Sequence, residues 1–365
     1  MQPKHIQNGF SLIELMISLT LGLLISAAVM QVYLTSIKTS SVQSGGTDIL
    51  EASIFGIQNI EKSIRLSNLG MADSNNPFTP LAGVVMTSDT SLVSASQTDK
   101  SKNNMNGIKM GGTVTSAGTD AIDAKYLTKS GIAASNITGL TSSQLTIQYE
   151  APQDMYDCEG TLVRGPIEIE RDGRLELIPG QVIVQRYYLR EVAQNDKSNY
   201  ESNIKSYELR CDAGRYVKEI LNSAELDLQK INDSTILKES RNIRDFGDVG
   251  EVVIPRVDYF GVLLGVEVVE PTSSVTLRYF TPEQYITYLE RLSATSTITT
   301  NIISVKLSAL VRADRPLTGE TGASKFIIFG EPKTLSTDTS KAFIRRVYES
   351  NIMLRNSRAI KESSI

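Results

Sequence analysis

The stretch that decides the fold of this chain is Phe10–Leu34, with the sequence FSLIELMISLTLGLLISAAVMQVYL. Its last 20 residues, Leu15–Leu34, carry no charge. As a helix rising about 1.5 Å per residue they measure about 30 Å, the thickness of the hydrocarbon core of a bilayer. The apolar run is too long for a secretory signal, and no obvious small-residue cleavage site follows it. We therefore expect the segment to stay attached to the chain and to span a membrane.

Two further features accompany this apolar run. Residues 1–9 are short, polar and mildly basic, and Glu14 places an acid among the apolar residues. A carboxylate within hydrocarbon costs about 3 kcal/mol on insertion scales, so such a group tends to have a function and a cationic partner. Cleavage after Gly9 would supply that partner, because the new amine of Phe10 would lie close to Glu14 in the same chain or in a neighbour. The alternative is an interfacial acid whose side chain reaches the headgroups.

The segment Gly-Phe-Ser-Leu-Ile-Glu-Leu-Met at 9–16 resembles the type IV prepilin signature. That resemblance implies that prepilin peptidase cuts after Gly9 and N-methylates Phe10. It also implies that Glu14 neutralises the amine of an adjacent subunit, while the apolar helix packs in the filament core with other minor pilins and the major pilin. Residues 1–9 are then the leader peptide, and 10–34 are the transmembrane and filament-core helix, held in the bacterial inner membrane before assembly.

Beyond Leu34 the chain becomes polar but keeps helical spacing, which predicts that the helix continues over 35–69 outside the membrane. We expect Gly45-Gly46 to loosen or bend it, and Gly70 with the prolines that follow to end it. Apolar residues at three- and four-residue steps predict one face that packs on a globular domain. These residues are Leu50, Ile54, Ile57, Ile60 and Ile64.

Residues 70–143 are expected to form a Ser/Thr/Gly-rich excursion from the domain. Within 86–143, 29 of the 58 residues are Ser, Thr, Asn or Gly, a composition that buries little apolar surface by itself. We expect short strands or disorder exposed on the surface, either as a variable recognition face or as a decoration without a partner.

Residues 144–365 are expected to form a β-rich globular domain, because strand signals alternate with turns rich in Gly, Pro, Asp and Asn. Few helices intervene, so we expect an antiparallel sheet and an α+β fold of the type IV pilin kind, with the long N-terminal helix packed on a large C-terminal domain. One helix is predicted over Pro282–Leu292, with Thr281 as its cap and Glu283 in its first turn. The predicted strands are Leu145–Tyr149, Ile167–Ile169, Val182–Leu189, Ser206–Cys211, Val252–Ile254, Val275–Tyr279, Ile302–Val311 and Phe343–Leu354.

The composition argues against most kinds of catalytic site. His5 is the only histidine, and cleavage of the leader removes it, so no imidazole remains as a base or as a zinc ligand. The sequence also lacks a P-loop, a dinucleotide fingerprint and a nucleophile elbow. We therefore expect no enzyme, no cofactor and no metal. Asp172 and Glu176 are weak candidates for a polar site, because Arg171 and Arg174 beside them indicate a solvated turn.

The charge of the chain gives no sign of nucleic-acid binding. The net charge is −4, from 37 basic and 41 acidic residues, so any such contact would have to be local. Basic residues near the C-terminus offer a local patch, but alternating strand positions and a frayed end explain them better, and we do not expect DNA as a partner. The residues of this patch are Arg345, Arg346, Arg355, Arg358 and Lys361.

The two cysteines, Cys158 and Cys211, are separated by 53 positions and form no CxxC motif. In a reducing cytosol they would be buried apolar residues, whereas in an oxidising compartment they could form a disulfide worth about 4 kcal/mol in the chain-entropy model. The short basic leader stays on the cytoplasmic side of the membrane. Everything after Leu34 then lies in the oxidising periplasm, and we predict a Cys158–Cys211 disulfide.

A second resemblance lies in the C-terminal half, where several segments look like the large minor pilins of the PilW family. This implies a minor pilin that joins other minor pilins and the pilus tip adhesin in the priming complex from which a pilus grows, at the cell surface. Two alternatives stay open: a minor pseudopilin of a type II secretion system, which shares the leader motif, and a membrane-anchored periplasmic protein of other function. The similar segments are Tyr156–Gly160, Arg186–Leu189, Leu209–Cys211, Arg256–Val262, Val305–Arg312 and Arg345–Asn356.

Overall fold

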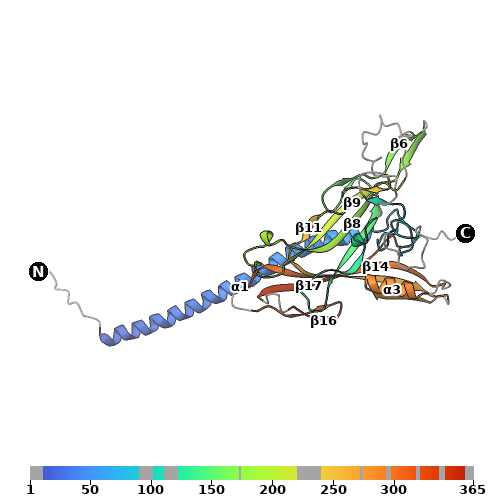
Figure 1. The fold of residues 1–365 in the computed structure, drawn as a ribbon. Helices are drawn as coiled ribbons and strands as arrows, with labels where there is room; N and C mark the ends of the chain where they lie inside the picture. The colour runs from blue at the N-terminus through green and yellow to red at the C-terminus, as the bar shows by residue number, and fades with distance from the viewer. Residues whose placement is uncertain are drawn as a thin grey trace.

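The computed structural model describes residues 11–89, 102–110, 122–171, 174–219, 240–271, 274–292, 297–317, 321–336 and 342–357. Helix α1 (Leu12–Leu66) is 55 residues long, and its N-terminal half projects well beyond the β-rich domain (Figure 1). The helix ends at Ser67, after which Asn68 turns the chain with a φ of 68°. It stays helical through Gly45-Gly46, the pair that we expected to loosen or bend it.

The C-terminal half of α1 packs on the domain through one stripe of side chains. Ile49, Ile60 and Ile64 are 2%, 1% and 0% exposed, so the prediction is confirmed for Ile60 and Ile64. It is wrong for Leu50 and Ile54, which are 38% and 42% exposed. These two residues lie roughly 100° around the helix from the buried stripe at 3.6 residues per turn. Because apolar residues occupy adjacent positions here, the spacing alone could not locate the centre of the stripe.

A five-stranded sheet in the order β11-β9-β8-β3-β2 forms one half of the domain, and every neighbouring pair in it is antiparallel. Alternate side chains of its central strands enter the main core, where Ile147 and Leu209 are fully buried. The predicted strands at 145–149, 182–189, 206–211 and 252–254 all belong to this sheet. Its strands are β2 (Lys129–Ala133), β3 (Ser142–Glu150), β8 (Val182–Glu191), β9 (Tyr207–Tyr216) and β11 (Glu251–Ile254).

A four-stranded antiparallel sheet in the order β13-β12-β14-β17 forms the other half. Strand β12 (Val257–Val269) is central to it but was not among the predicted strands. Both of its faces are largely buried, so its sequence has no alternation of apolar and polar residues to mark a strand. The other strands are β13 (Val275–Phe280), β14 (Thr299–Pro316) and β17 (Phe343–Met353), all predicted from the sequence.

Short elements complete the domain. Helix α3 (Pro282–Arg291) begins as predicted, with Thr281 capping it and Glu283 in its first turn, and Gln284 completes a capping box. The hairpin formed by β6 (Ile167–Arg171) and β7 (Arg174–Ile178) projects from the domain (Figure 1). The remaining strands are β1 (Lys109–Met110), β4 (Met155–Tyr156), β5 (Leu162–Val163), β10 (Asn242–Ile243), β15 (Lys325–Ile328) and β16 (Glu331–Thr334).

The expectation that 86–143 lies exposed on the surface is wrong for the residues that the structure describes. Met105, Ile108 and Ile122 are 1%, 2% and 2% exposed, and they pack in a second core cluster with Val184 and Tyr216 of the five-stranded sheet. Asn and Ser side chains here bind backbone groups: Asn104 Oδ1 accepts from the amide of Met86 at 2.8 Å, and Ser88 Oγ donates to the carbonyl of Ile122 at 2.8 Å. A polar composition therefore did not prevent burial, because the few apolar residues of the segment share the core of the sheet.

Candidate functional site

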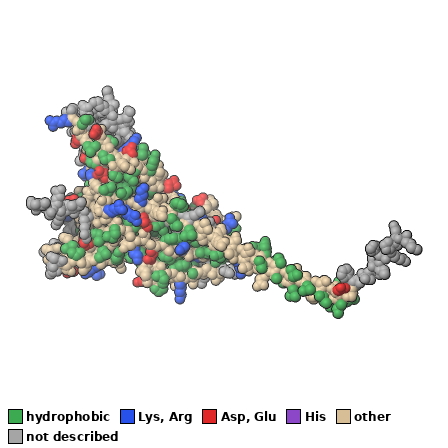
Figure 2. All heavy atoms as spheres, turned by 180° about the vertical axis from the view of Figure 1, so that it is seen from behind, with side chains coloured by type: hydrophobic (Ala, Val, Ile, Leu, Met, Phe, Trp, Pro, Cys, Tyr) green, Lys and Arg blue, Asp and Glu red, His purple; other side chains and the backbone are tan. Residues whose placement is uncertain are grey.

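The N-terminal part of α1 is the most conspicuous candidate site, because its apolar side chains pack against no other part of the chain that the structure describes. Its span Leu12–Thr47 contains 36 residues and is long and apolar enough to cross a membrane, and residues 12–40 within it are all exposed. The exposed side chains form a continuous apolar surface along the projecting rod (Figure 2). A core helix of a soluble protein would be mostly buried, so this helix needs either lipid or other proteins around it.

Glu14 lies in the first turn of this helix and caps its N-terminus. The Ser11 amide and hydroxyl lie 3.3 Å and 3.4 Å from Glu14 Oε2, and the Glu14 amide donates to Ser11 Oγ at 3.2 Å. This is a capping box, which holds the acid against the positive end of the helix dipole. This second role was not predicted from the sequence, although the Ser-x-x-Glu spacing is its known signal. Gly9 and Phe10, the predicted cleavage and methylation positions, lie outside the described residues.

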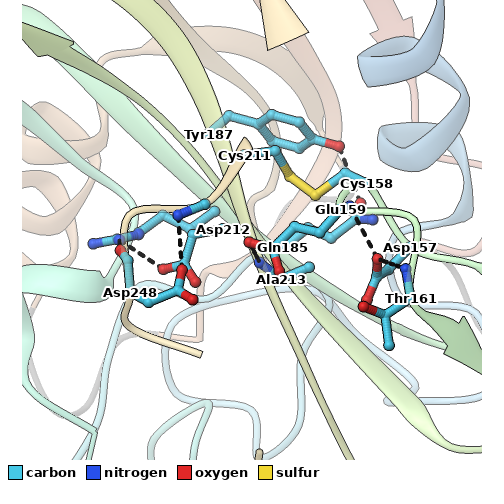
Figure 3. The surroundings of a disulfide bond; sticks show 12 residues. Asp157, Cys158, Glu159, Thr161, Gln185, Tyr187, Cys211, Asp212, Ala213 and Asp248 are labelled. Atoms are coloured by element: carbon cyan, nitrogen blue, oxygen red, sulfur yellow. Dashed lines mark hydrogen bonds and ion pairs between the residues drawn. A yellow bond between two sulfur atoms is a disulfide. The ribbon is translucent and has the colours of Figure 1, made fainter. Parts of the chain in front are cut away.

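The predicted disulfide is present. Cys158, in the loop after β4, is bonded to Cys211 of β9 with a Cα–Cα distance of 6.2 Å (Figure 3), within the usual range for disulfides. Cys211 is fully buried. The bond therefore fastens the β4–β5 hairpin to the interior of the five-stranded sheet.

A groove of about 580 Å³ runs between α1 and this fastened hairpin. Its rim carries two exposed aromatic side chains, Phe55 of α1 and Tyr156 of β4, and Tyr149 and Tyr187 lie at its base. Burial raises the pKa of Tyr149 to about 12, so its hydroxyl stays protonated at neutral pH. The lining offers hydrogen-bond partners, apolar contact and one carboxyl group, that of Asp157, whose pKa is raised by burial.

Three carboxyl groups gather beside the disulfide. Oxygens of Glu159, Asp212 and Asp248 lie within 4.8 Å of one another (Figure 3), and Glu159 also accepts from the Ala213 amide at 3.2 Å. Burial raises the pKa of Glu159 to about 7 and that of Asp212 to about 6. The cluster is therefore only partly ionised near neutral pH, which limits the repulsion among its members.

These three carboxylates have the spacing that a cation would need, but an arginine already supplies positive charge. Arg186 Nη2 lies 2.6 Å from Asp212 Oδ2, and both side chains are buried. The guanidinium also stacks 4.1 Å from the ring centroid of Tyr188. We interpret the cluster as an ion pair that joins β8, β9 and the loop at Asp248.

A second ion network is buried within the four-stranded sheet. Asp258, Arg312 and Arg345, from three adjacent strands, have side chains that are 0% exposed. Arg345 Nε donates to Asp258 Oδ2 at 2.6 Å, and Asn136 Nδ2 donates to Asp258 Oδ1 at 2.7 Å. Arg312 Nε lies 3.6 Å from Asp258 Oδ1, and its Nη2 pairs with Glu201. Asp258 is thus the hub between β12, β14, β17 and two loops.

The weaker candidates of the sequence do not form a site. Arg345 belongs to the buried network, so it cannot contribute to a surface patch for DNA, and Arg358 and Lys361 lie outside the described residues. Glu176 lies on β7 of the projecting hairpin, and Asp172 lies outside the described residues. The described part of the chain thus brings none of these residues together around a common cavity.

Comparisons with known proteins bear on both ends of this architecture. A family model described as the prokaryotic N-terminal methylation motif matches residues 4–30, which include Glu14 and the start of the apolar helix. The model described as type IV pilus-assembly protein W, PilW, matches residues 228–356, which include all four strands of the second sheet. The C-terminal third of the chain is thus similar to the PilW family, and its N-terminus carries the methylation motif of type IV pilin-like proteins.

One solved structure was also found to be similar to this chain. It is a type IV-like pilin from Thermus thermophilus, 12% identical, with a TM-score of 0.23, and the match covers 62% of this chain and 82% of that one. With so low a TM-score, this likeness adds nothing to the assignment. No curated protein sequence matches the chain.

These two family-model matches account for the exposed helix at a coarse level. The methylation motif and the apolar helix indicate a membrane anchor and association with a pilus, and PilW-family proteins are structural components. The PilW match also contains Asp258, Arg312 and Arg345. The arginines and the aspartate that carried the resemblance in the sequence therefore form the internal frame of the second sheet.

Proposed function

We propose that this chain is a minor pilin in the priming complex at the tip of a type IV pilus. Prepilin peptidase cleaves it after Gly9, the new terminus at Phe10 is N-methylated, and the complex presents the tip adhesin. The observation that carries the proposal is the apolar N-terminal part of α1, in which residues 12–40 are all exposed in the described part of the chain. A helix of this kind is stable in the inner membrane and can leave it only by exchanging lipid for other helices.

The position of Glu14 supports this exchange. Its carboxylate lies in the N-terminal turn of α1, where, among the described residues, it accepts hydrogen bonds from the amide and hydroxyl of Ser11. An N-terminal amine on a neighbouring helix would give this acid a full charge partner in a low-dielectric setting, where ion pairing is strongest. Because that pairing is available only among helices, it favours assembly over the lipid-bound state.

The size and outline of the domain support a low-copy position. The β6–β7 hairpin projects from the domain (Figure 1), and Leu175 and Leu177 on it are 75% and 64% exposed. A subunit that repeats along a filament has to pack laterally around a helical core, which such a projection would obstruct. A subunit at the tip has free space above it. The domain in this proposal faces the periplasm before assembly and the cell exterior afterwards.

The proposal is tested by the location and phenotype of the chain. Pili sheared from cells are expected to contain it in small amounts beside the major pilin, and deletion of its gene is expected to abolish pili while secretion through a type II system stays normal. Loss of secretion with normal pili would instead identify a minor pseudopilin. Gly9→Leu provides the processing control, since it is expected to leave a full-length precursor in the membrane and out of the pili.

A further inference from the structure

Strand β13 forms an outer edge of the four-stranded sheet and leaves one side of its backbone free. Its six residues pair with β12 in unbroken register, from Val269 opposite Val275 to Leu264 opposite Phe280. Among the described residues, no backbone hydrogen bond joins β13 to any element other than β12. Its outer N–H and C=O groups therefore form a ready template for one more strand.

The same strand exposes a row of apolar side chains. Val275, Leu277 and Tyr279 alternate along it, share one face of the sheet, and are 58%, 50% and 41% exposed. A Cβ at Gly265 of β12 would lie 3.1 Å from Tyr279 Cε1, so this glycine makes room for the tyrosine ring on the sheet face. On the far strand, β17, Met353 is 55% exposed. The edge thus combines free backbone with an apolar surface.

The other outer strands of the two large sheets are protected in ways that β13 is not. The pairings of β11 and β2 both contain a register shift, and β17 contains one and also contacts α1. Natural edges also carry lysine or proline to prevent pairing. The sequence Val-Thr-Leu-Arg-Tyr-Phe of β13 contains neither, its one charged residue is Arg278, and its register has no shift. Such an edge is a template for pairing with another chain.

We propose that the edge of β13 accepts an extended segment of a different protein as an added strand. Apolar side chains at every second position of that segment would cover Val275, Leu277 and Tyr279, which is the usual basis of specificity in strand addition. An acidic side chain would face Arg278. Its side chain is 47% exposed, and its ion pair with Glu270 is long, with 4.0 Å between Nη2 and Oε1. Such an added strand is compatible with a role in a pilus and with a role in a type II secretion system.

The charge of the edge decides against a second copy of this chain as the occupant. Strand β13 contains no acid, so two such strands paired in any register would leave both Arg278 guanidiniums without a new carboxylate. A different segment with apolar residues in alternation and one acid between them satisfies the apolar row and the arginine together.

Photo-crosslinking of the full chain in its own cells tests the proposal. The photoreactive residue p-benzoylphenylalanine (Bpa) is placed singly by Val275→Bpa, Leu277→Bpa and Tyr279→Bpa, and the adducts are mapped by mass spectrometry. We expect one protein in all three adducts, with its linked residues stepping by two as the probe steps by two. Ile327→Bpa, at a 60% exposed position of β15, is expected to give no adduct with that protein. Adducts with a second copy, linked residues without this order, or no adduct at all would overturn the proposal.

Two substitutions then test the contributions of the apolar side chains of β13 and of the positive charge of Arg278. In chains that carry Val275→Bpa, Leu277→Arg is expected to lower the adduct yield at least tenfold and Arg278→Glu at least fivefold, while the matched Ile327→Arg leaves it unchanged. Formation of the Cys158–Cys211 disulfide, read on a non-reducing gel, reports that each variant has folded. An oxidised Leu277→Arg chain with undiminished adduct would contradict the apolar row, and the same result for Arg278→Glu would contradict the acidic partner.

Discussion

Asp258→Asn should destabilise the domain more than any single surface change, because Asp258 is the hub of the buried ion network. Its carboxylate accepts from Arg345 at 2.6 Å and from Asn136 at 2.7 Å, and it lies 3.6 Å from Arg312. The substitution keeps the shape of the side chain but removes the charge and turns one acceptor into a donor. Glu201 would then be the single acid left for two buried guanidiniums.

The expected loss follows from the burial of the partners. Asp258, Arg312 and Arg345 have side chains that are 0% exposed, and removing one member of a buried ion pair costs about 3–5 kcal/mol. That is a large fraction of the roughly 5–15 kcal/mol by which domains are stable. At about 2–4 °C for each kcal/mol in a domain of this size, the midpoint of thermal unfolding should fall by roughly 10 °C.

The assay is thermal unfolding of the full chain in detergent, followed by tyrosine fluorescence, since the chain has 14 tyrosines and no tryptophan. The matched control is Asp154→Asn, which breaks the 2.9 Å ion pair of Arg164 with Asp154, whose side chains are 46% and 54% exposed. Such exposed pairs contribute about 0–1 kcal/mol, so the control should shift the midpoint by less than about 3 °C. Equal shifts for the two variants would refute the view that the buried network holds the second sheet together.

Three further predictions concern other parts of the chain. Glu14→Gln keeps an N-terminal cap but removes the charge, so membrane insertion should be normal while the amount of chain in sheared pili falls at least tenfold. Ser11→Ala, which keeps the charge, should still assemble into pili. If Ser11→Ala failed to assemble and Glu14→Gln assembled normally, Glu14 would act only as a helix cap. Replacing Cys158 and Cys211 together by serine should cost about 4 kcal/mol of stability, from the chain entropy of the loop that they close, and a loss below about 1 kcal/mol would contradict this. The pKa of Glu159 is raised from 4.5 to about 7, so the folded state holds the proton of this carboxyl group more tightly than the unfolded state does, and stability should fall as pH rises from about 4.5 to 7. Glu159→Gln should make the unfolding midpoint less dependent on pH in this range. An unchanged dependence would argue against a raised pKa at Glu159.

The sequence alone predicted the parts of the fold that rest on local pattern. The uncharged run Leu15–Leu34, the helix Pro282–Arg291 with its Thr281 cap, and strands with strong alternation were all recognisable. The Cys158–Cys211 bond followed from the compartment that the N-terminus implies. The helices and strands were predictable because they depend on residues close together in sequence. The disulfide was predictable because it depends on the oxidising compartment.

The rest depends on contacts that no local pattern encodes. Strand β12 is buried on both faces and lacks alternation, so it was missed although it is the centre of its sheet. The burial of Met105 and Ile122 depends on partners in β8 and β9. Asp258 appeared only as part of a similar segment, since its role comes from Arg312 and Arg345, 54 and 87 residues further along the chain.

Cleavage after Gly9 and methylation of Phe10 are central to the proposed function, and mass spectrometry of the chain recovered from sheared pili tests them most directly. The predicted result is a chain that begins at Phe10, with a methyl group on its amine and without residues 1–9. A chain that still begins at Met1, with the leader intact and the amine unmethylated, would contradict the account.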